Sequence, residues 1–215
     1  GNYAGCLWFQ DCSDITIREV TARNFNGDGI SWQICHDVVL DHCRTLNNAM
    51  LGMHPGSGSQ RPVIHDCEIS GNSIGLFFCW GVRFGLVEKC LIHSNADTGI
   101  SIGHRDHGNT IRDCVIRGNG NQGILFRAER GEGFTAAANT IETCRIVDNG
   151  SENGAAIDIQ GVTAGNRFIQ NQFVETRGPA RRVAIRLGPQ AGEQHFERNR
   201  FRGFYREIER AETAS

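Results

Sequence analysis

Proline, net charge and long apolar runs are all scarce in this sequence. Only 4 of its 215 residues are proline, and the formal net charge is −2, with acidic and basic residues mixed along the chain. A chain with this charge has no excess of basic residues of the kind that nucleic-acid-binding proteins carry, so we expect no nucleic-acid partner. No apolar run reaches the roughly 20 residues that a membrane helix requires, which predicts no membrane span. No charged-then-apolar signal segment opens the chain, which indicates a mature product or an excised fragment.

Helical periodicity is also absent, whereas glycine and asparagine are plentiful. The chain has 27 glycines, and asparagine recurs at regular intervals. With so little proline, this composition suits tight turns between short strands. Nine cysteines are present, but no pair has the CxxC spacing of a zinc finger. Five of them share one repeat position, where small buried thiols would fill a core. Free thiols fit a reducing compartment or simple burial, so they do not decide the location.

One sequence pattern repeats eight times along the chain. Its anchor position recurs at intervals of 23, 24, 23, 24, 30, 27 and 28 residues, and a period of this length is typical of solenoids. The anchors are Val20, Cys43, Cys67, Cys90, Cys114, Cys144, Asn171 and Asn199. Because the copies follow one another without interruption, the sequence predicts a single domain over residues 1–215.

Each repeat has apolar residues at positions that suit short strands. The residues three before the anchor and, in most copies, two after it are apolar, as Ile111 and Ile116 are around Cys114. A second strand with alternating residues follows, for example Gly123-Ile124-Leu125-Phe126, whose first and third apolar residues are predicted to point inward. Between the two lies an asparagine five residues after the anchor, at Asn48, Asn72, Asn95, Asn119 and Asn149. We predict an asparagine ladder at a sharp bend, since asparagine tolerates left-handed backbone.

This period and pattern predict a parallel β-helix. Its coils would climb about 4.8 Å per turn, with identical side chains stacked on one another. Leucine-rich repeats have a similar period, but their leucine-and-asparagine pattern is absent here.

The sequence resembles the right-handed parallel β-helix superfamily, the pectate-lyase-like group, in its G-I-x-[IWF] and [IV]-x-x-C-x-I units and its asparagine ladder. The stretches 52–60 and 101–109 also look like those of large bacterial β-helix proteins. The resemblance covers essentially the whole chain and implies an all-β, right-handed, single-stranded solenoid of about eight coils of 23–30 residues. The group includes glycoside hydrolases, polysaccharide lyases and uronate epimerases, which implies a polysaccharide or oligosaccharide partner. We expect a secreted, periplasmic or cell-surface location, although free cysteines also fit the cytoplasm.

The ends and the longer repeats depart from the regular coil. Gly5-Cys6-Leu7-Trp8 aligns with Gly29-Ile30-Ser31-Trp32 and no cap precedes it, so we expect a fragment of a longer chain, or a partner that covers the open first coil. Residues 204–215 are expected to form a C-terminal cap or tail, with an amphipathic segment over 204–210. Extra residues are predicted to bulge out and build a binding wall around 127–138, 150–155 and 176–182.

Chemistry is expected on outward residues, because the inward residues of a β-helix fill its core. Side chains on neighbouring coils lie within roughly 5 Å of one another along the axis, so polar residues can stack into a site. The densest stack is centred on His104-Arg105-Asp106-His107 and draws on the neighbouring coils. Its other members are Trp80, Arg83, Arg127 and Glu129, with His54, Gln60 and Arg61 two coils below and Asp158 in the same outward face.

Imidazoles beside a carboxylate can supply general acid and base groups near neutral pH. We therefore predict His104 and Asp106 as catalytic residues, assisted by His54. Arg105 and Arg127 would hold a uronate carboxylate. Trp80 would offer a flat face to a sugar ring. The remaining candidates for substrate binding are Arg83, His107, Glu129, Asp158, Gln60 and Arg61. The alternative interpretation of the His-Arg-Asp-His run is a solvated, hydrogen-bonded loop.

A pair of carboxylates is a second route to catalysis, since glycoside hydrolysis uses two acids roughly 5–10 Å apart. Asp106, Glu129 and Asp158 are the candidates for such a pair. No cofactor is expected, and Asp106 with loop carbonyls is the place where a calcium ion would bind weakly. Two functional hypotheses remain. The first is a carbohydrate-active enzyme, either a polysaccharide lyase or a glycoside hydrolase. The second is a non-catalytic glycan-binding or structural rod of a larger surface protein.

Overall fold

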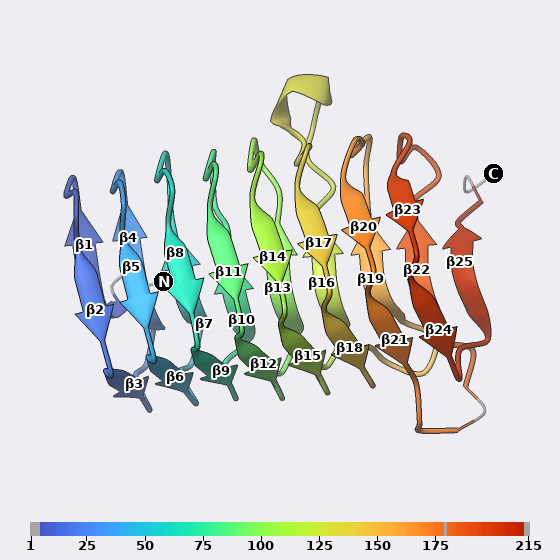
Figure 1. The fold of residues 1–215 in the computed structure, drawn as a ribbon, viewed down its shortest axis with the longest axis horizontal. Helices are drawn as coiled ribbons and strands as arrows, with labels where there is room; N and C mark the ends of the chain where they lie inside the picture. Colours follow the sequence, from blue (N-terminus) through green and yellow to red (C-terminus); the bar gives the residue numbers. More distant parts are fainter. Residues whose placement is uncertain (1–4, 179, 213–215) are drawn as a thin grey trace.

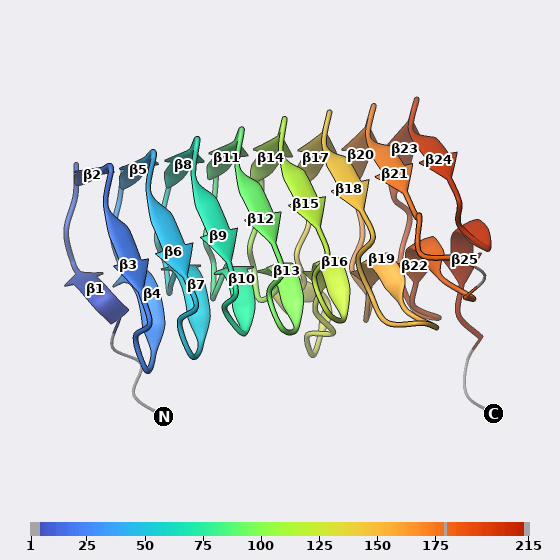
Figure 2. The ribbon, with the colours of Figure 1, turned by 90° about the horizontal axis from the view of Figure 1, so that it is seen from below.

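The chain forms a rod of stacked coils whose faces are three parallel β-sheets (Figure 1). The computed structural model describes residues 5–178 and 180–212. Each coil contributes one strand to each sheet, and every strand pairs in parallel with its counterpart in the next coil. Figure 2 shows the coils side by side from the N-terminal to the C-terminal end of the rod. The predicted all-β parallel β-helix is confirmed.

The largest sheet has nine strands and corresponds to the alternating second strand of the repeat. Its strands are β1 (Gly5–Gln10), β4 (Asp28–Gln33), β7 (Leu51–Pro55), β10 (Ile74–Phe77), β13 (Thr98–Ile102), β16 (Gln122–Phe126), β19 (Ala155–Ile159), β22 (Val183–Leu187) and β25 (Arg206–Arg210). Its register places identical residues side by side in adjacent strands, as Ile124 lies between Ile100 and Ile157. A slip of one residue would turn this buried row outward, which is why the apolar pattern fixes the register.

The other two sheets have eight strands each, all of three residues. One contains β2 (Thr16–Arg18), β5 (Val39–Asp41), β8 (Val63–His65), β11 (Leu86–Glu88), β14 (Thr110–Arg112), β17 (Thr140–Glu142), β20 (Arg167–Ile169) and β23 (His195–Glu197). The other contains β3 (Thr21–Arg23), β6 (Arg44–Leu46), β9 (Glu68–Ser70), β12 (Leu91–His93), β15 (Val115–Arg117), β18 (Arg145–Val147), β21 (Gln172–Val174) and β24 (Arg200–Arg202). The apolar residues on either side of an anchor therefore belong to different sheets, as Ile111 and Ile116 do.

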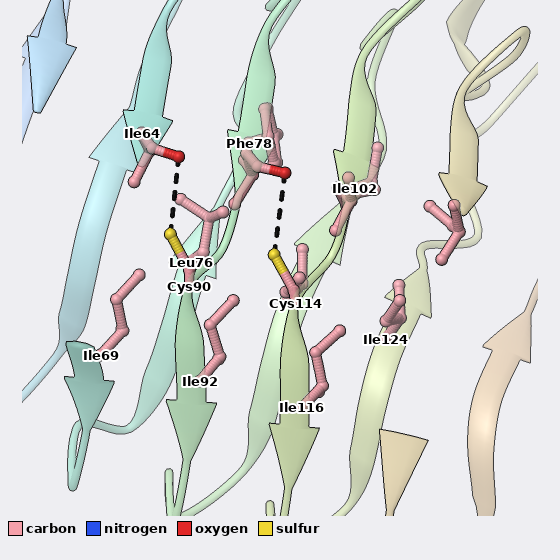
Figure 3. Close-up of a cluster of buried hydrophobic side chains, with 14 of the residues drawn as sticks. Ile64, Ile69, Leu76, Phe78, Cys90, Ile92, Ile102, Cys114, Ile116 and Ile124 are labelled. Atoms are coloured by element: carbon pink, nitrogen blue, oxygen red, sulfur yellow. Dashed lines mark hydrogen bonds between the residues drawn. The ribbon is translucent and has the colours of Figure 1, made fainter. Parts of the chain in front are cut away.

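Identical side chains stack in the interior (Figure 3). Ile92 lies between Ile69 and Ile116, and all three are fully buried. The anchor cysteines are buried free thiols. Each donates to a carbonyl of the preceding coil, as the Cys114 Sγ does to the Val87 carbonyl at 3.7 Å. The cysteine ladder is thus part of the core, as the sequence predicts.

The chain bends at left-handed residues that precede the anchor and the asparagine ladder. Asp113 has a φ of 53° just before Cys114, and Gly118 has a φ of 60° just before Asn119. The bend therefore falls one residue earlier than predicted, because the ladder residue uses its side chain to bridge coils. The Asn119 Nδ2 donates to the Asn149 Oδ1 at 2.8 Å, and its Oδ1 accepts the Asn95 backbone N–H at 3.1 Å.

The clearest departure from the rod is the loop between β16 and β17, which projects beyond the neighbouring turns and contains η1 (Glu132–Phe134) (Figure 1). It coincides with the bulge predicted around 127–138. At the C-terminal end, β25 pairs with β22 and continues the nine-stranded sheet; residues 213–215 of the expected cap or tail, and residue 179, lie outside the described part. Within 5–178 and 180–212, no helix is long and apolar enough to cross a membrane.

Candidate functional site

The outer face of the nine-stranded sheet contains the candidate site. The register places His54 beside Ser31 and Phe77 beside Ser101, as the predicted alternation requires. A cavity of about 530 Å³ opens on this face over β4, β7 and β10, and we call it the His54 cavity. It is lined by Asp28, Gln33, Met50, Leu51, His54, Ser57, Phe77, Cys79 and Trp80.

A buried imidazole and a buried carboxylate meet in the wall of this cavity. The His54 Nδ1 lies 2.9 Å from the Asp28 Oδ2, and the two side chains are 7% and 2% exposed. The other carboxylate oxygen of Asp28 accepts the backbone N–H of Leu51 at 3.2 Å. The ring of Phe77 packs edge-on against His54, with 5.6 Å between ring centroids. These contacts give His54 one orientation, and its Nε2 has no hydrogen-bond partner among the described residues.

Three aromatic rings, which we call the aromatic wall, stand between the His54 cavity and a second cavity. Trp80 stacks on His104 with 4.5 Å between ring centroids, and Phe134 lies against His104 at 4.9 Å. The second cavity has a volume of about 420 Å³ and is lined by His104, Ala128, Glu129, Arg130 and Phe134. Trp80 lines the His54 cavity and is 60% exposed, so the aromatic wall offers a flat apolar surface to a ligand.

Glu129 holds His104 from the side of the second cavity. The Glu129 Oε1 accepts the backbone N–H of His104 at 3.1 Å, and its Oε2 lies 3.6 Å from the His104 Nδ1. Burial acts to raise the pKa of Glu129, but the His104 N–H and the Arg127 guanidinium outweigh it and leave this pKa below its ordinary value. Glu129 is therefore a carboxylate at neutral pH.

Arg127 fastens the aromatic wall to the sheet. Its Nη1 donates to the Ser101 Oγ at 2.8 Å, its Nη2 to the Phe78 carbonyl at 2.9 Å, and its Nε to Glu129 at 3.2 Å. The guanidinium also lies over the ring of Phe77, 4.3 Å from the centroid. With its side chain 18% exposed, Arg127 mainly supports its neighbours and presents one edge to a ligand.

Asp106 lies beneath this cluster and is fully buried. Its Oδ1 accepts the backbone N–H groups of Gly81 and Val82 at 3.0 and 2.9 Å, and its Oδ2 accepts that of Gly103 at 2.8 Å. Burial raises the pKa of Asp106 to about 7, against the opposing effect of these donors and of Arg127. A carboxyl group bonded in this way ties two coils together and contacts only protein.

We expect Asp106 to make folding stability depend on pH. Its pKa of about 7 in the folded protein lies above the ordinary value of 3.8, so the folded state binds this proton more tightly than the unfolded state. The stabilisation is complete below pH 4 and is lost as the pH rises through 7. Asp106→Asn should remove this dependence and cost about 1–3 kcal/mol at pH 5, since its NH₂ would face the Gly103 N–H. Urea unfolding at pH 5 and pH 7 measures both effects. If the unfolding free energy of the variant fell between these pH values as much as that of the unmodified protein, the assignment would be contradicted.

Four of the predicted substrate-binding residues lie past the corner that follows the nine-stranded sheet, and they line neither cavity. They are Gln60, Arg61, Arg83 and His107. Three of them stack in successive coils as single parallel bridges. For His107 the reason is local: Arg105 is left-handed with a φ of 62°, and the chain turns there. Neighbours in the His-Arg-Asp-His run consequently face different sides of the coil.

Two other predicted residues lie at the margins of the site. Asp158 is in the outward row on β19, where its Oδ2 accepts the Gln160 Nε2 at 3.0 Å. Arg105 turns toward the projecting loop, with its guanidinium 4.2 Å from the centroid of the Phe134 ring. Of the predicted residues, the structure gathers four around the aromatic wall, with His54 in the adjoining cavity. These four are Trp80, His104, Arg127 and Glu129.

The site also includes Asp28 and Phe134, which the sequence does not single out. Asp28 begins β4 and is only 1% exposed; no motif marks it, because its partner His54 belongs to the next coil. Phe134 lies in η1, within the bulge predicted from the lengthened repeat. The extra length of that repeat is the sequence feature that could have pointed to Phe134.

The weak calcium site expected at Asp106 stays a prediction. Among the described residues, no group of three or more His, Cys, Asp or Glu side chains is arranged to hold a metal ion. Both oxygens of Asp106 are bonded to backbone N–H groups.

Comparison with known proteins places this architecture in a family. A family model described as right handed beta helix region matches residues 5–201. The chain belongs to the right-handed β-helix family. Membership confirms the handedness that the sequence resemblance implies. No curated protein has a sequence that matches this β-helix.

Several solved structures resemble this β-helix at low sequence identity. The periplasmic alginate epimerase AlgG has a TM-score of 0.63 and 13% identity over 84% of this chain and 50% of its own. The catalytic domain of a GH87 alpha-1,3-glucanase has a TM-score of 0.71 and 10% identity over 88% of this chain and 40% of its own. PfbA, a surface adhesin of Streptococcus pneumoniae, has a TM-score of 0.62 and 10% identity over 95% of this chain and 63% of its own. The chain thus spans 40 to 63% of these structures, and the likeness shows the fold alone.

Proposed function

We propose that this chain is the β-helix part of a carbohydrate-active enzyme that acts on a polysaccharide lying over the nine-stranded sheet. The observation that supports this most is one cavity that combines the exposed ring of Trp80 with the buried pair of His54 and Asp28. An aromatic ring can pack against the apolar face of a sugar, and an imidazole can serve as acid or base near neutral pH. Structures of similar fold that include an alginate epimerase and a glucanase lend further support.

His54 is the catalytic acid/base residue in this proposal. It lines the same cavity as Trp80, whereas His104 packs against two aromatic rings and lines the second cavity, and Asp106 is fully buried. His104 and Asp106 then act as positioning residues, since they support Trp80 and the turn beside it. Glu129 and Arg130 line the second cavity and would bind the next part of the glycan.

Proton abstraction, as in a lyase or an epimerase, suits this geometry better than hydrolysis by two carboxylates. The carboxylates that line the two cavities are Asp28, which is bonded to His54, and Glu129, which lies beyond the aromatic wall. A hydrolase needs two carboxyl groups that face the same bond. A histidine that removes a proton next to a uronate carboxylate needs no such partner. We therefore propose an acidic polysaccharide as the substrate, and a secreted, periplasmic or cell-surface location.

A glycan screen tests this function. Polysaccharides with and without uronate are incubated with the protein and followed by ultraviolet absorbance, by reducing ends and by NMR. An unsaturated product, or a changed uronate without cleavage, would support proton abstraction. New reducing ends without unsaturation would instead favour a hydrolase. Binding with no product would favour the non-catalytic rod, the role that the similar adhesin suggests.

Trp80→Ala is expected to weaken glycan binding about tenfold, because it removes the exposed face of the aromatic wall. Phe84→Ala is the matched control: Phe84 is 63% exposed, close to the 60% of Trp80, but it lines neither cavity. Titration calorimetry with a substrate found in the screen measures both variants. Equal losses for the two would contradict the location of the site.

A further inference from the structure

A groove lined by polar side chains lies at an edge of the rod away from the candidate site. The turns between the two eight-stranded sheets stack into this edge, which contains the anchor positions, and we call it the anchor edge. Where β20 turns into β21 and β23 into β24, the anchor edge has a groove of about 540 Å³. Its lining residues are Gln170, Gln172, Arg198, Asn199 and Arg200.

The stacked turns present these side chains as two parallel rows. Gln170 and Arg198 are left-handed, with φ of 54° and 51°, and form the row before the anchor. In the row after the anchor, the register places Gln172 between Arg145 and Arg200. All five side chains are exposed. Since neighbouring coils are about 4.8 Å apart, the two arginines of the second row are about 10 Å from each other along the axis.

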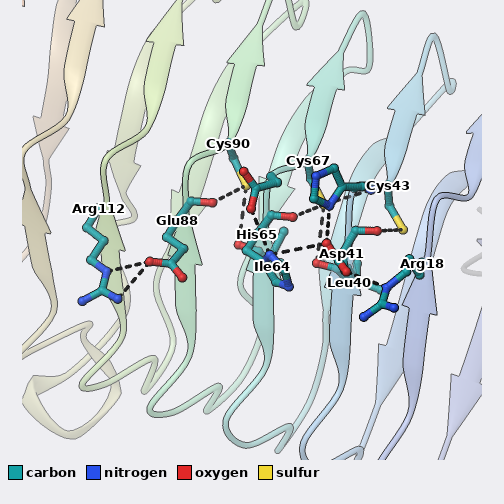
Figure 4. Close-up of polar contacts among 12 residues, drawn as sticks. Arg18, Leu40, Asp41, Cys43, Ile64, His65, Cys67, Glu88, Cys90 and Arg112 are labelled. Carbon is teal, nitrogen blue, oxygen red and sulfur yellow. Dashed lines mark hydrogen bonds and ion pairs between the residues drawn. The ribbon is translucent and has the colours of Figure 1, made fainter.

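The arginines of this end are free of acidic partners, in contrast to those nearer the N-terminal end. There, arginines are paired with carboxylates of the neighbouring coil, as Arg18 is with Asp41 at 2.6 Å and Arg112 is with Glu88 at 2.9 Å (Figure 4). Within residues 5–178 and 180–212, no side-chain hydrogen bond or ion pair engages Arg200 or its counterpart two coils earlier. The C-terminal end of the anchor edge thus has unpaired positive charge.

Arg198 adds to this charge, although an acid lies beside it. Its Nε is 3.5 Å from the Glu197 Oε1, and its side chain remains 73% exposed. The Glu197 carboxylate is shared with His195, whose Nε2 lies 3.4 Å from Oε2. An exposed ion pair of this length is weak, so Arg198 can turn to a stronger anionic partner.

The two kinds of side chain in the groove fit two kinds of group on a ligand. A guanidinium binds a carboxylate or sulfate through parallel N–H donors. The Gln170 and Gln172 amides each have a donor and an acceptor, which suits hydroxyl groups. A sugar that carries an acid group offers both. Nucleic acid is the weaker match, because single strands are bound by stacking on aromatic rings, and no aromatic residue lines this groove.

We propose that this groove is a second binding site, for the acid groups and hydroxyls of an acidic polysaccharide. Arg198 and Arg200 hold one carboxylate, the two glutamines bond sugar hydroxyls, and Arg145 reaches an acid group further along the polymer. The site goes beyond the proposed function, since it binds and does no chemistry. A polymer held here stays at high local concentration near the candidate site on the nine-stranded sheet.

NMR of the side-chain amides of Gln170 and Gln172 tests the site in the unmodified protein. The probes are an oligosaccharide of galacturonate, a galactose oligosaccharide of the same length and a single-stranded DNA oligonucleotide. We expect both amide signals to shift with the galacturonate probe and to stay in place with the neutral one. Unmoved signals with galacturonate would overturn the inference, and tighter binding of DNA would overturn the choice of ligand.

The variant that replaces both groove arginines, Arg198→Gln with Arg200→Gln, should raise the Kd for galacturonate about tenfold, read from the same two signals. Arg117→Gln is the matched control: Arg117 is exposed on β15, in the same sheet as Arg200, but does not line the groove. Equal losses in the two proteins would mean general charge attraction and would contradict a built site.

Turnover measured on the same samples separates this site from the proposed function. Shifted glutamine signals without turnover of any glycan would end the proposed function and leave the groove as a binding site. Turnover with unmoved signals would do the reverse.

Discussion

Substitution of His54 by glutamine is expected to lower kcat about 10²–10⁴-fold, with a smaller effect on KM. Glutamine has a similar length and can still bond Asp28, but it cannot take up a proton. The loss should therefore fall on the chemical step and not on binding, which depends on Trp80 and Phe77. Steady-state kinetics on the substrate found by the glycan screen provide the measurement, with thermal melting to show that the buried site still folds.

His104→Gln is the matched comparison, and we expect it to lower kcat about tenfold or less. The His104 ring packs against Trp80 and Phe134, with 4.5 and 4.9 Å between ring centroids, so in the proposed function the substitution disturbs the aromatic wall and not the acid/base group. If His104→Gln abolished turnover while His54→Gln retained it, the acid/base role would belong to His104. The two variants thus decide between the histidines that the sequence alone places in one group.

Inward residues could be read from the sequence, because their pattern and the register determine each other. Ile100, Ile124 and Ile157 recur at one position and lie side by side in the sheet, since any slip would place apolar side chains in water. Cys114 could be assigned to the core for the same reason. A side chain that recurs at one position of the repeat indicates a buried position, and its regular recurrence indicates stacked coils.

Outward residues were harder to place, because their directions depend on the corners. His104 and His107 are three residues apart, yet the left-handed turn at Arg105 sends them to different sides. Asp28 and His54 are distant in sequence and meet across neighbouring coils. A single polar residue that occurs in one coil only has no repeat to reveal its role. The fold was therefore predictable, and the pairing within the site was not.

Asn119→Ala is expected to lower the free energy of unfolding by about 3–5 kcal/mol, the largest stability effect that we predict for an uncharged residue. The Asn119 Nδ2 donates to the Ile92 carbonyl at 3.3 Å and to the Asn149 Oδ1 at 2.8 Å. Its Oδ1 accepts the backbone N–H of Asn95 at 3.1 Å and the Asn95 Nδ2 at 2.9 Å. Truncation leaves a buried donor and a buried acceptor of the main chain unpaired, at about 1–3 kcal/mol each.

Cys114→Ala separates hydrogen bonding from packing at the anchor of the same coil, five residues before Asn119. Cys114 is as buried as Asn119, at 1% exposure, but its thiol is a weak donor, so we expect a cost of only about 1–2 kcal/mol for the lost volume. Asn121→Ala, at an exposed asparagine, should stay within about 0.5 kcal/mol. Urea unfolding of the three variants gives the order. Equal costs for Asn119 and Cys114 would mean that shape alone holds the coils in register. The expected order would mean that the asparagine ladder does so, because each ladder asparagine bonds main-chain groups of the preceding coil, as Asn119 bonds the Ile92 carbonyl and the Asn95 N–H on either side of the left-handed Ser94.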